Sequence, residues 1–128
     1  MQEKHIKAIL TTTGAITMLP VLQYFLPGSM LALQGLSVSD DTGYFFAQHW
    51  GFLAFCFGAM LVYAARRPVH RTPIVLAAGV EKLAFVALIA FNWNYPALQG
   101  FHLPAFFDAT CVILYALILM SPSKSIPK

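Results

Sequence analysis

The chain has 128 residues, of which 59% are hydrophobic and 10% are charged, and its formal net charge is +3. Soluble domains carry about 25% charged residues, so this composition excludes an ordinary water-soluble domain and predicts a surface that faces lipid. The basic residues lie in short clusters between apolar runs, which excludes the continuous basic face of a nucleic-acid-binding protein. The length fits one domain, so we treat residues 1–128 as a single transmembrane domain.

The first apolar run, Ile6–Leu26, follows Lys4 and Lys7. A cleaved signal peptide has an apolar core of about 7–15 residues and a small-residue cleavage site. This run is longer and no such site follows it, so we interpret it as a retained membrane-spanning helix. Pro20 lies inside the run and predicts a kink.

Three more runs reach the roughly 20 apolar residues that a span needs. The segment 27–43 before the second run is itself partly apolar, and we expect it to lie at the outer interface or to fold over the bundle. Pro68 ends the second run, and Thr72 and Pro73 supply an N-cap and a first-turn proline for the third. The predicted spans are Tyr44–Ala65, Pro73–Asn92 and Phe101–Met120.

The placement of the cations predicts the orientation. With four spans, seven of them fall on one side of the membrane: Lys4, Lys7, Arg66, Arg67, Arg71, Lys124 and Lys128. The positive-inside rule places that side in the cytoplasm. We therefore expect an all-α, four-helix transmembrane bundle in the cell inner membrane, with both termini cytoplasmic. Five aromatic residues fall near the opposite boundary, where an aromatic belt would lie: Tyr24, Tyr44, Trp50, Trp93 and Tyr95.

Polar residues interrupt three of the spans, although an ionisable group there costs about 2.5–3.5 kcal/mol on insertion scales. Glu81 and Lys82 lie near the middle of the third span, about 15 Å below its outer end. Asp108 lies about 6–10 Å below the outer end of the fourth, and Gln48 and His49 lie at a similar depth in the second. The sequence therefore predicts a polar cluster in the outer half of the bundle, where Lys82 can extend toward Asp108.

This cluster has three interpretations. The formal charges of Glu81, Lys82 and Asp108 sum to −1, so a shared proton would relieve the excess charge. The cluster is then a buried polar lock that fixes helix register, a site for a ligand, ion or proton, or an interface with another membrane subunit. The ligand-binding or proton-sharing candidates are Gln48, His49, Glu81, Lys82, Asp108 and Tyr115.

Cofactor and metal sites find little support. Cys56 and Cys111 each stand alone in an apolar run, as packing residues do, and Cys and His do not occur at metal-ligand spacing. His49 is the one candidate axial ligand for a haem or a chlorophyll-type pigment, and the alternative is a hydrogen-bonded histidine. We expect no cofactor.

Helical phase predicts one close contact between helices. The second span carries a stripe of small residues, which lets the backbone of another helix approach closely. The stripe comprises Ala47, Gly51, Ala54 and Gly58.

Three short motifs resemble those of small four-span bacterial membrane proteins of the DoxX-like group. They are the stretch Phe46-Ala47-Gln48-His49-Trp50-Gly51, the pair Glu81-Lys82, and Phe107-Asp108-Ala109 followed by Tyr115. The resemblance implies a four-helix bundle in a bacterial inner membrane and suggests that these polar positions belong together. It assigns them no reaction.

The favoured function is a ligand- or lipid-binding protein or an accessory subunit, with membrane lipids, a second copy or a larger membrane complex as partners, and no nucleic acid. One alternative is a proton-coupled small transporter, which would act as an oligomer. Another is a lipid-modifying enzyme with Glu81, Asp108 and His49 as acid and base, which requires these groups to face one cavity. A dry, fully paired Lys82 would instead indicate a structural lock.

Overall fold

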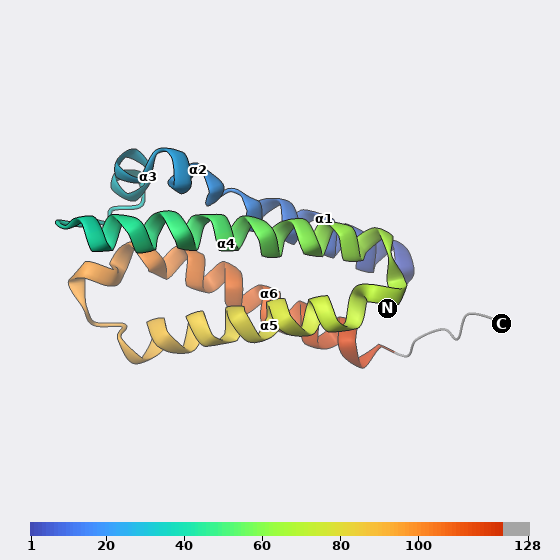
Figure 1. Ribbon diagram of the computed structural model, residues 1–128. Coiled ribbons are helices and arrows are strands. Elements are labelled where there is room, and N and C mark those ends of the chain that lie inside the picture. Colours follow the sequence, from blue (N-terminus) through green and yellow to red (C-terminus); the bar gives the residue numbers. More distant parts are fainter. Residues whose placement is uncertain (122–128) are drawn as a thin grey trace.

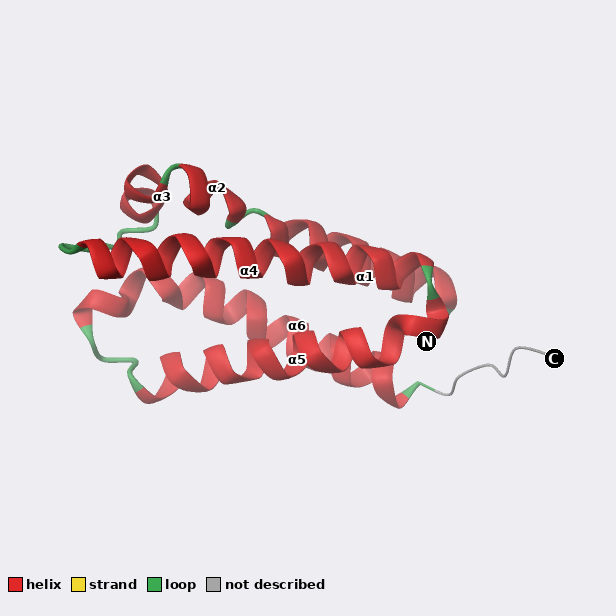
Figure 2. Cartoon of the chain, in the orientation of Figure 1, coloured by secondary structure: helices red, strands yellow, loops and turns green. Residues whose placement is uncertain are grey.

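The computed structural model describes residues 1–121, and this part of the chain contains helices and loops but no strand (Figure 2). Four helical segments are long and apolar enough to cross a membrane, which confirms the four-helix transmembrane bundle. The helices are α1 (Glu3–Met18), α2 (Val21–Phe25), α3 (Pro27–Leu33), α4 (Asp41–Arg66), α5 (Pro68–Phe91), the 3-10 helix η1 (Pro96–Phe101) and α6 (His102–Met120) (Figure 1).

The first span is divided at Pro20, where the sequence predicts a kink. Helix α1 ends at Met18 and α2 begins at Val21. Proline has no backbone N–H, and its ring collides with the carbonyl of the preceding turn. The helix therefore breaks here instead of bending.

The segment between the first two spans folds over one end of the bundle. It forms the short helix α3, which lies beside α2 and the start of α4 (Figure 1). Leu31 and Leu36 are buried. The carbonyl oxygen of Gln34 lies so close to Gly100 that any side chain at position 100 would collide with it. Of the two arrangements expected for this segment, at the outer interface or folded over the bundle, the structure shows the second.

The third span begins five residues earlier than predicted. Only Arg67 separates α4 from α5, which starts at Pro68 and continues through Pro73. Pro68 provides the helical φ of a first position, and the residue before a proline is driven to extended backbone, which ends α4. Pro73 removes one hydrogen bond, the one to the carbonyl of Val69. Because that carbonyl lies in the first turn of α5, at the end of the bundle, the helix tolerates the loss.

Glycines allow a close contact between α1 and α4. A Cβ at Gly58 would lie 2.5 Å from the carbonyl oxygen of Gly14, and a Cβ at Gly14 would lie 2.8 Å from that of Gly58. Gly51 accommodates the carbonyl of Pro20 at the break between α1 and α2 in the same way. The small-residue stripe of the second span therefore contacts the first span, which the sequence left unspecified.

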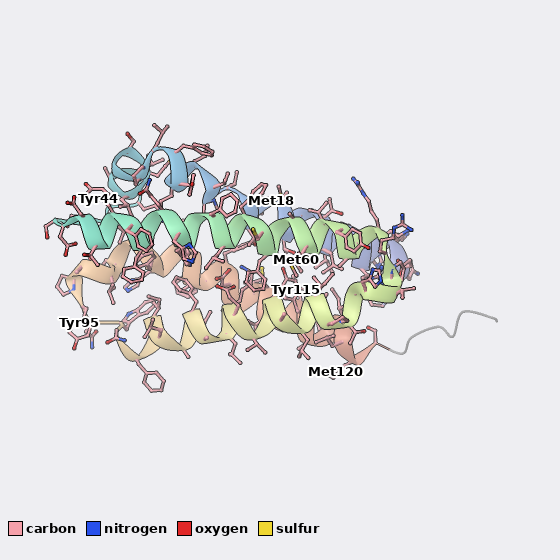
Figure 3. The ribbon with its side chains drawn as sticks, viewed as in Figure 1. Met18, Tyr44, Met60, Tyr95, Tyr115 and Met120 are labelled. Atoms are coloured by element: carbon pink, nitrogen blue, oxygen red, sulfur yellow. The ribbon has the colours of Figure 1, made fainter. Side chains whose placement is uncertain are left out.

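The two ends of the bundle differ in composition. The start of α1, the link between α4 and α5 and the end of α6 lie at one end, which we call the basic end (Figure 1). The amine of Met1 donates a hydrogen bond to Oγ of Ser121 at 3.4 Å there. Tyr44 and Tyr95 lie at the opposite end (Figure 3). Lys124 and Lys128, which the orientation argument also used, lie outside the described residues.

The core between the helices is narrow. Its fully buried side chains include Leu10, Leu61, Val75 and Tyr115. Most of the remaining large apolar side chains point outward, and Phe91 is 90% exposed. An exposed apolar surface of this extent is typical of a protein that faces lipid or another protein.

Candidate functional site

An ion pair between α5 and α6 lies at the centre of the candidate site. Lys82 Nζ donates a hydrogen bond to the carboxylate of Asp108 and lies 5.3 Å from the ring centroid of Phe107. Lys82 is only 3% exposed and Asp108 is 9% exposed. The expectation that Lys82 extends toward Asp108 is confirmed.

Helical phase places these two charges in the interior. Lys82 follows Ala78 by one turn, and both side chains are buried on one face of α5. Asp108 shares the inner face of α6 with Ala105 and Cys111. The mostly apolar inner faces of α5 and α6 thus each carry one charge, and the two charges have opposite signs. Burying either charge alone would be costly, and pairing offsets that cost.

Glu81 is adjacent to Lys82 in sequence but takes a different position. It lies about 100° around α5, is half-buried, and makes no hydrogen bond or ion pair with the side chains of residues 1–121. Phe85, one turn further along, packs its ring against Trp50 of α4 at 6.2 Å between centroids. Glu81 therefore lies at mid-span on the edge of α5 between the side that faces α4 and the exposed side that carries Ala77 and Ala84, and its carboxyl is unpaired within the described residues.

Tyr115 belongs to a separate contact. Its hydroxyl donates a hydrogen bond to Oγ1 of Thr13 at 2.8 Å, and Thr13 donates to the carbonyl of Ile9 at 2.8 Å. Tyr115 lies near the middle of the bundle, between α6 and α1 (Figure 3). Because it is seven residues from Asp108, it is about 10 Å further along the bundle toward the basic end. It connects two helices and does not touch the ion pair.

Gln48 and His49 are also placed apart from Lys82. The side-chain amide of Gln48 donates to the carbonyl of Tyr24 at 2.8 Å, and that of Gln23 donates to the carbonyl of Ala47 at 2.7 Å, so two glutamines tie α2 to α4. His49 is exposed on the outer surface of α4, where its ring stacks on Phe45 with 5° between the planes. The expected convergence is therefore limited to Lys82 and Asp108.

Sequence reasoning missed a second ion pair, at the basic end. Arg71 donates from its two terminal nitrogens to the two carboxylate oxygens of Glu3, at 2.9 and 2.7 Å. It also donates to the carbonyls of Ala64 and Ala65, at 3.3 and 3.4 Å. The predicted third span begins at Pro73, which leaves Arg71 in the preceding loop. A helix start at Pro68 would have placed it in the first turn of α5, where an acidic partner is expected.

The cavity described between α5 and α6 is not lined by Lys82 or Asp108. An open groove of about 110 Å³ runs between α5 and α6 in the half away from the basic end. Its lining is entirely apolar and comprises Val86, Ile89, Ala90, Trp93, Ala105, Phe106 and Ala109. Within residues 1–121, no three His, Cys, Asp or Glu side chains are grouped to hold a metal ion.

The arrangement limits the chemistry. Asp108 is committed to Lys82, His49 faces outward, and Glu81 lies on a different flank. Acid–base catalysis requires such groups within hydrogen-bond reach of one substrate, and these side chains do not face a common cavity. The geometry supports an interhelix lock at Lys82 and Asp108 with one unpaired carboxyl beside it.

Comparisons with known proteins add no relative: no family model, no curated protein and no solved structure matches the chain. The similarity to DoxX-like proteins thus rests on the three short motifs alone.

Proposed function

We propose that this chain is an accessory subunit of a membrane assembly, with both termini in the cytoplasm and the bundle in the inner membrane. It would bind a transmembrane helix of its partner along the flank of α5 that carries Glu81. The observation that carries the proposal is the unpaired carboxyl of Glu81 at mid-span.

The depth of Glu81 argues for a protein partner. It lies about 15 Å from the nearer end of α5, too deep for a lipid headgroup to reach in a hydrocarbon core about 30 Å thick. A hydrogen-bond donor on a neighbouring transmembrane helix would satisfy the carboxyl. Hydrogen bonds between membrane helices contribute about 0.6 kcal/mol on average and up to about 1.7 kcal/mol.

The surroundings of Glu81 suit a close helix contact. Ala77 and Ala84 lie on the same flank, about one turn to either side of Glu81, and both are exposed. Small side chains let helix backbones approach closely in lipid, where packing and polar contacts drive association. The flank therefore combines an unpaired polar group with room for a neighbour.

Native mass spectrometry of the gently extracted protein tests this proposal. We expect the wild-type chain to carry a second copy or another subunit, and Glu81→Leu to lose it. Glu81→Gln, which keeps hydrogen-bonding atoms, should retain part of it. Leu83→Ala is the matched control, because Leu83 is exposed on the other side of α5. A wild-type chain that is monomeric under the mildest extraction would contradict the proposal.

The same observation favours one second candidate, a proton-coupled small transporter acting as an oligomer. Glu81 can take up and release a proton without breaking the pair of Lys82 and Asp108, because its carboxyl has no partner within the described chain. Flux in liposomes that depends on a pH gradient and is lost in Glu81→Gln would support this function. Reconstituted protein without any such flux would contradict it.

A further inference from the structure

The basic end carries four cations that form no ion pair with a described acidic group. Lys4, Lys7, Arg66 and Arg67 are all exposed there. The single acidic residue of that end, Glu3, is already paired with Arg71. The other four acidic residues of the chain lie at mid-span or at the opposite end: Asp40, Asp41, Glu81 and Asp108.

The fold gathers these cations from two separate parts of the sequence. The two-point contact of Arg71 with Glu3, at 2.7 and 2.9 Å, holds the first turn of α1 against the first turn of α5. Hydrogen bonds from Arg71 to the carbonyls of Ala64 and Ala65 add the end of α4. Lys4 follows Glu3 directly, and Arg66 follows Ala65. The lysine pair and the arginine pair therefore both begin next to residues that Arg71 holds by hydrogen bonds.

The link that carries the two arginines is itself fixed. The hydroxyl of Tyr63 and Nδ1 of His70 share a hydrogen bond of 2.8 Å across it, and their rings stack at 5.7 Å with 11° between the planes. Arg67 is the only residue between α4 and α5. Arg66 and Arg67 are therefore presented from a short, braced corner and not from a long loop.

We propose that the basic end is a binding site for the headgroups of anionic phospholipids, with the lipid phosphate held between the arginine pair and the lysine pair. The guanidinium group of arginine matches the geometry of phosphate oxygens, and basic residues beside a span attract anionic lipids. The ends of spanning helices lie at headgroup depth. This proposal goes beyond the proposed accessory function and is independent of Glu81.

Lipid competition followed by native mass spectrometry tests it. The full-length chain is reconstituted in nanodiscs of mixed phosphatidylglycerol and phosphatidylcholine, and the lipids retained on release are counted. We expect the wild-type chain to favour phosphatidylglycerol. Each basic residue contributes about 1 kcal/mol near an anionic surface, so the double variant Arg66→Gln/Arg67→Gln should lower the preference about 30-fold. Lys4→Gln/Lys7→Gln should lower it to a similar extent.

Two further measurements distinguish a specific lipid-binding site from nonspecific electrostatic attraction. Asp40→Asn/Asp41→Asn raises the net charge by two at the opposite end, and it should leave the preference unchanged. Inorganic phosphate in excess should not displace the retained lipid. Equal retention of both lipids by the wild-type chain would overturn the proposal, as would an unchanged preference in both basic-end variants. A preference that inorganic phosphate abolishes would reassign the site to a soluble anion and would also overturn it.

Discussion

The ion pair of Lys82 and Asp108 is enclosed at mid-span, so removing one partner leaves the other charge without compensation. Loss of one member of a buried pair costs about 3–5 kcal/mol. We expect Lys82→Met to lower the free energy of unfolding in detergent by about that amount. Lys82→Met/Asp108→Leu should recover most of the loss, because no charge is then left buried. A double variant as unstable as the single one would show that the pair does more than compensate charge.

The hydroxyl of Tyr115 connects α6 to Thr13 of α1 by a hydrogen bond. Tyr115→Phe removes this hydrogen bond and preserves the ring, so we expect a loss of about 0.6–1.7 kcal/mol in the free energy of unfolding. Thr110→Val is the control, because the hydroxyl of Thr110 bonds only the carbonyl of Phe106 in its own helix. If the two variants lose equal stability, the contact between helices contributes nothing of its own.

Residue contacts were predictable from the sequence only where depth alone decided them. The sequence places Lys82 about 15 Å and Asp108 about 6–10 Å below the outer ends of their helices, a difference that the long side chain of Lys82 can span, and the two do form a pair. Depth does not tell which way a side chain faces, so His49 was grouped with the pair although it points outward. Arg71 was missed because its partner, Glu3, is 68 residues away and the start of α5 was misplaced.

Helices α1 and α4 approach each other closely at Gly14 and Gly58. A Cβ at Gly58 would lie 2.5 Å from a backbone oxygen, and backbone cannot move aside as a flexible side chain can. We expect Gly58→Ala to lower the free energy of unfolding by about 1–3 kcal/mol, the usual cost of overpacking.

Gly79 provides the matched control for this prediction. A Cβ at Gly79 of α5 would lie 3.9 Å from Tyr115, which is ordinary contact. Because alanine favours helix by about 1 kcal/mol over glycine, Gly79→Ala should be neutral or stabilising. Equal destabilisation by both alanines in thermal unfolding would contradict a specific role for the contact of Gly14 and Gly58.

The helices show which features of the fold a pattern of apolar runs can predict. Four spans follow from the lengths of the runs, and proline geometry predicts a kink at Pro20, where the helix is in fact divided. The start of α5 was misplaced because both Pro68 and Pro73 suit a first helical turn, and only the fold shows that the helix passes through the second one. The small-residue stripe predicts a close contact on α4, but it does not identify α1 as the helix that makes this contact.

An even number of spans returns the chain to the end of the bundle where it began, and the hydrogen bond between Met1 and Ser121 agrees with this. The predicted orientation across the membrane rests on charge: the opposite end has no lysine or arginine among the described residues and carries Asp40 and Asp41. Since cytoplasmic loops retain basic residues, the basic end should face the cytoplasm.

Labelling with a membrane-impermeant maleimide tests this orientation. A cysteine introduced by Gln2→Cys at the basic end should react only when the cytoplasmic face is accessible, as in inverted vesicles. One introduced by Asn94→Cys, in the loop between α5 and η1, should react only in intact spheroplasts. The unsubstituted chain is the control, because Cys56 and Cys111 lie within spans and are not fully exposed. Labelling of Gln2→Cys in intact spheroplasts would reverse the orientation, and it would place the four exposed cations in the outer leaflet.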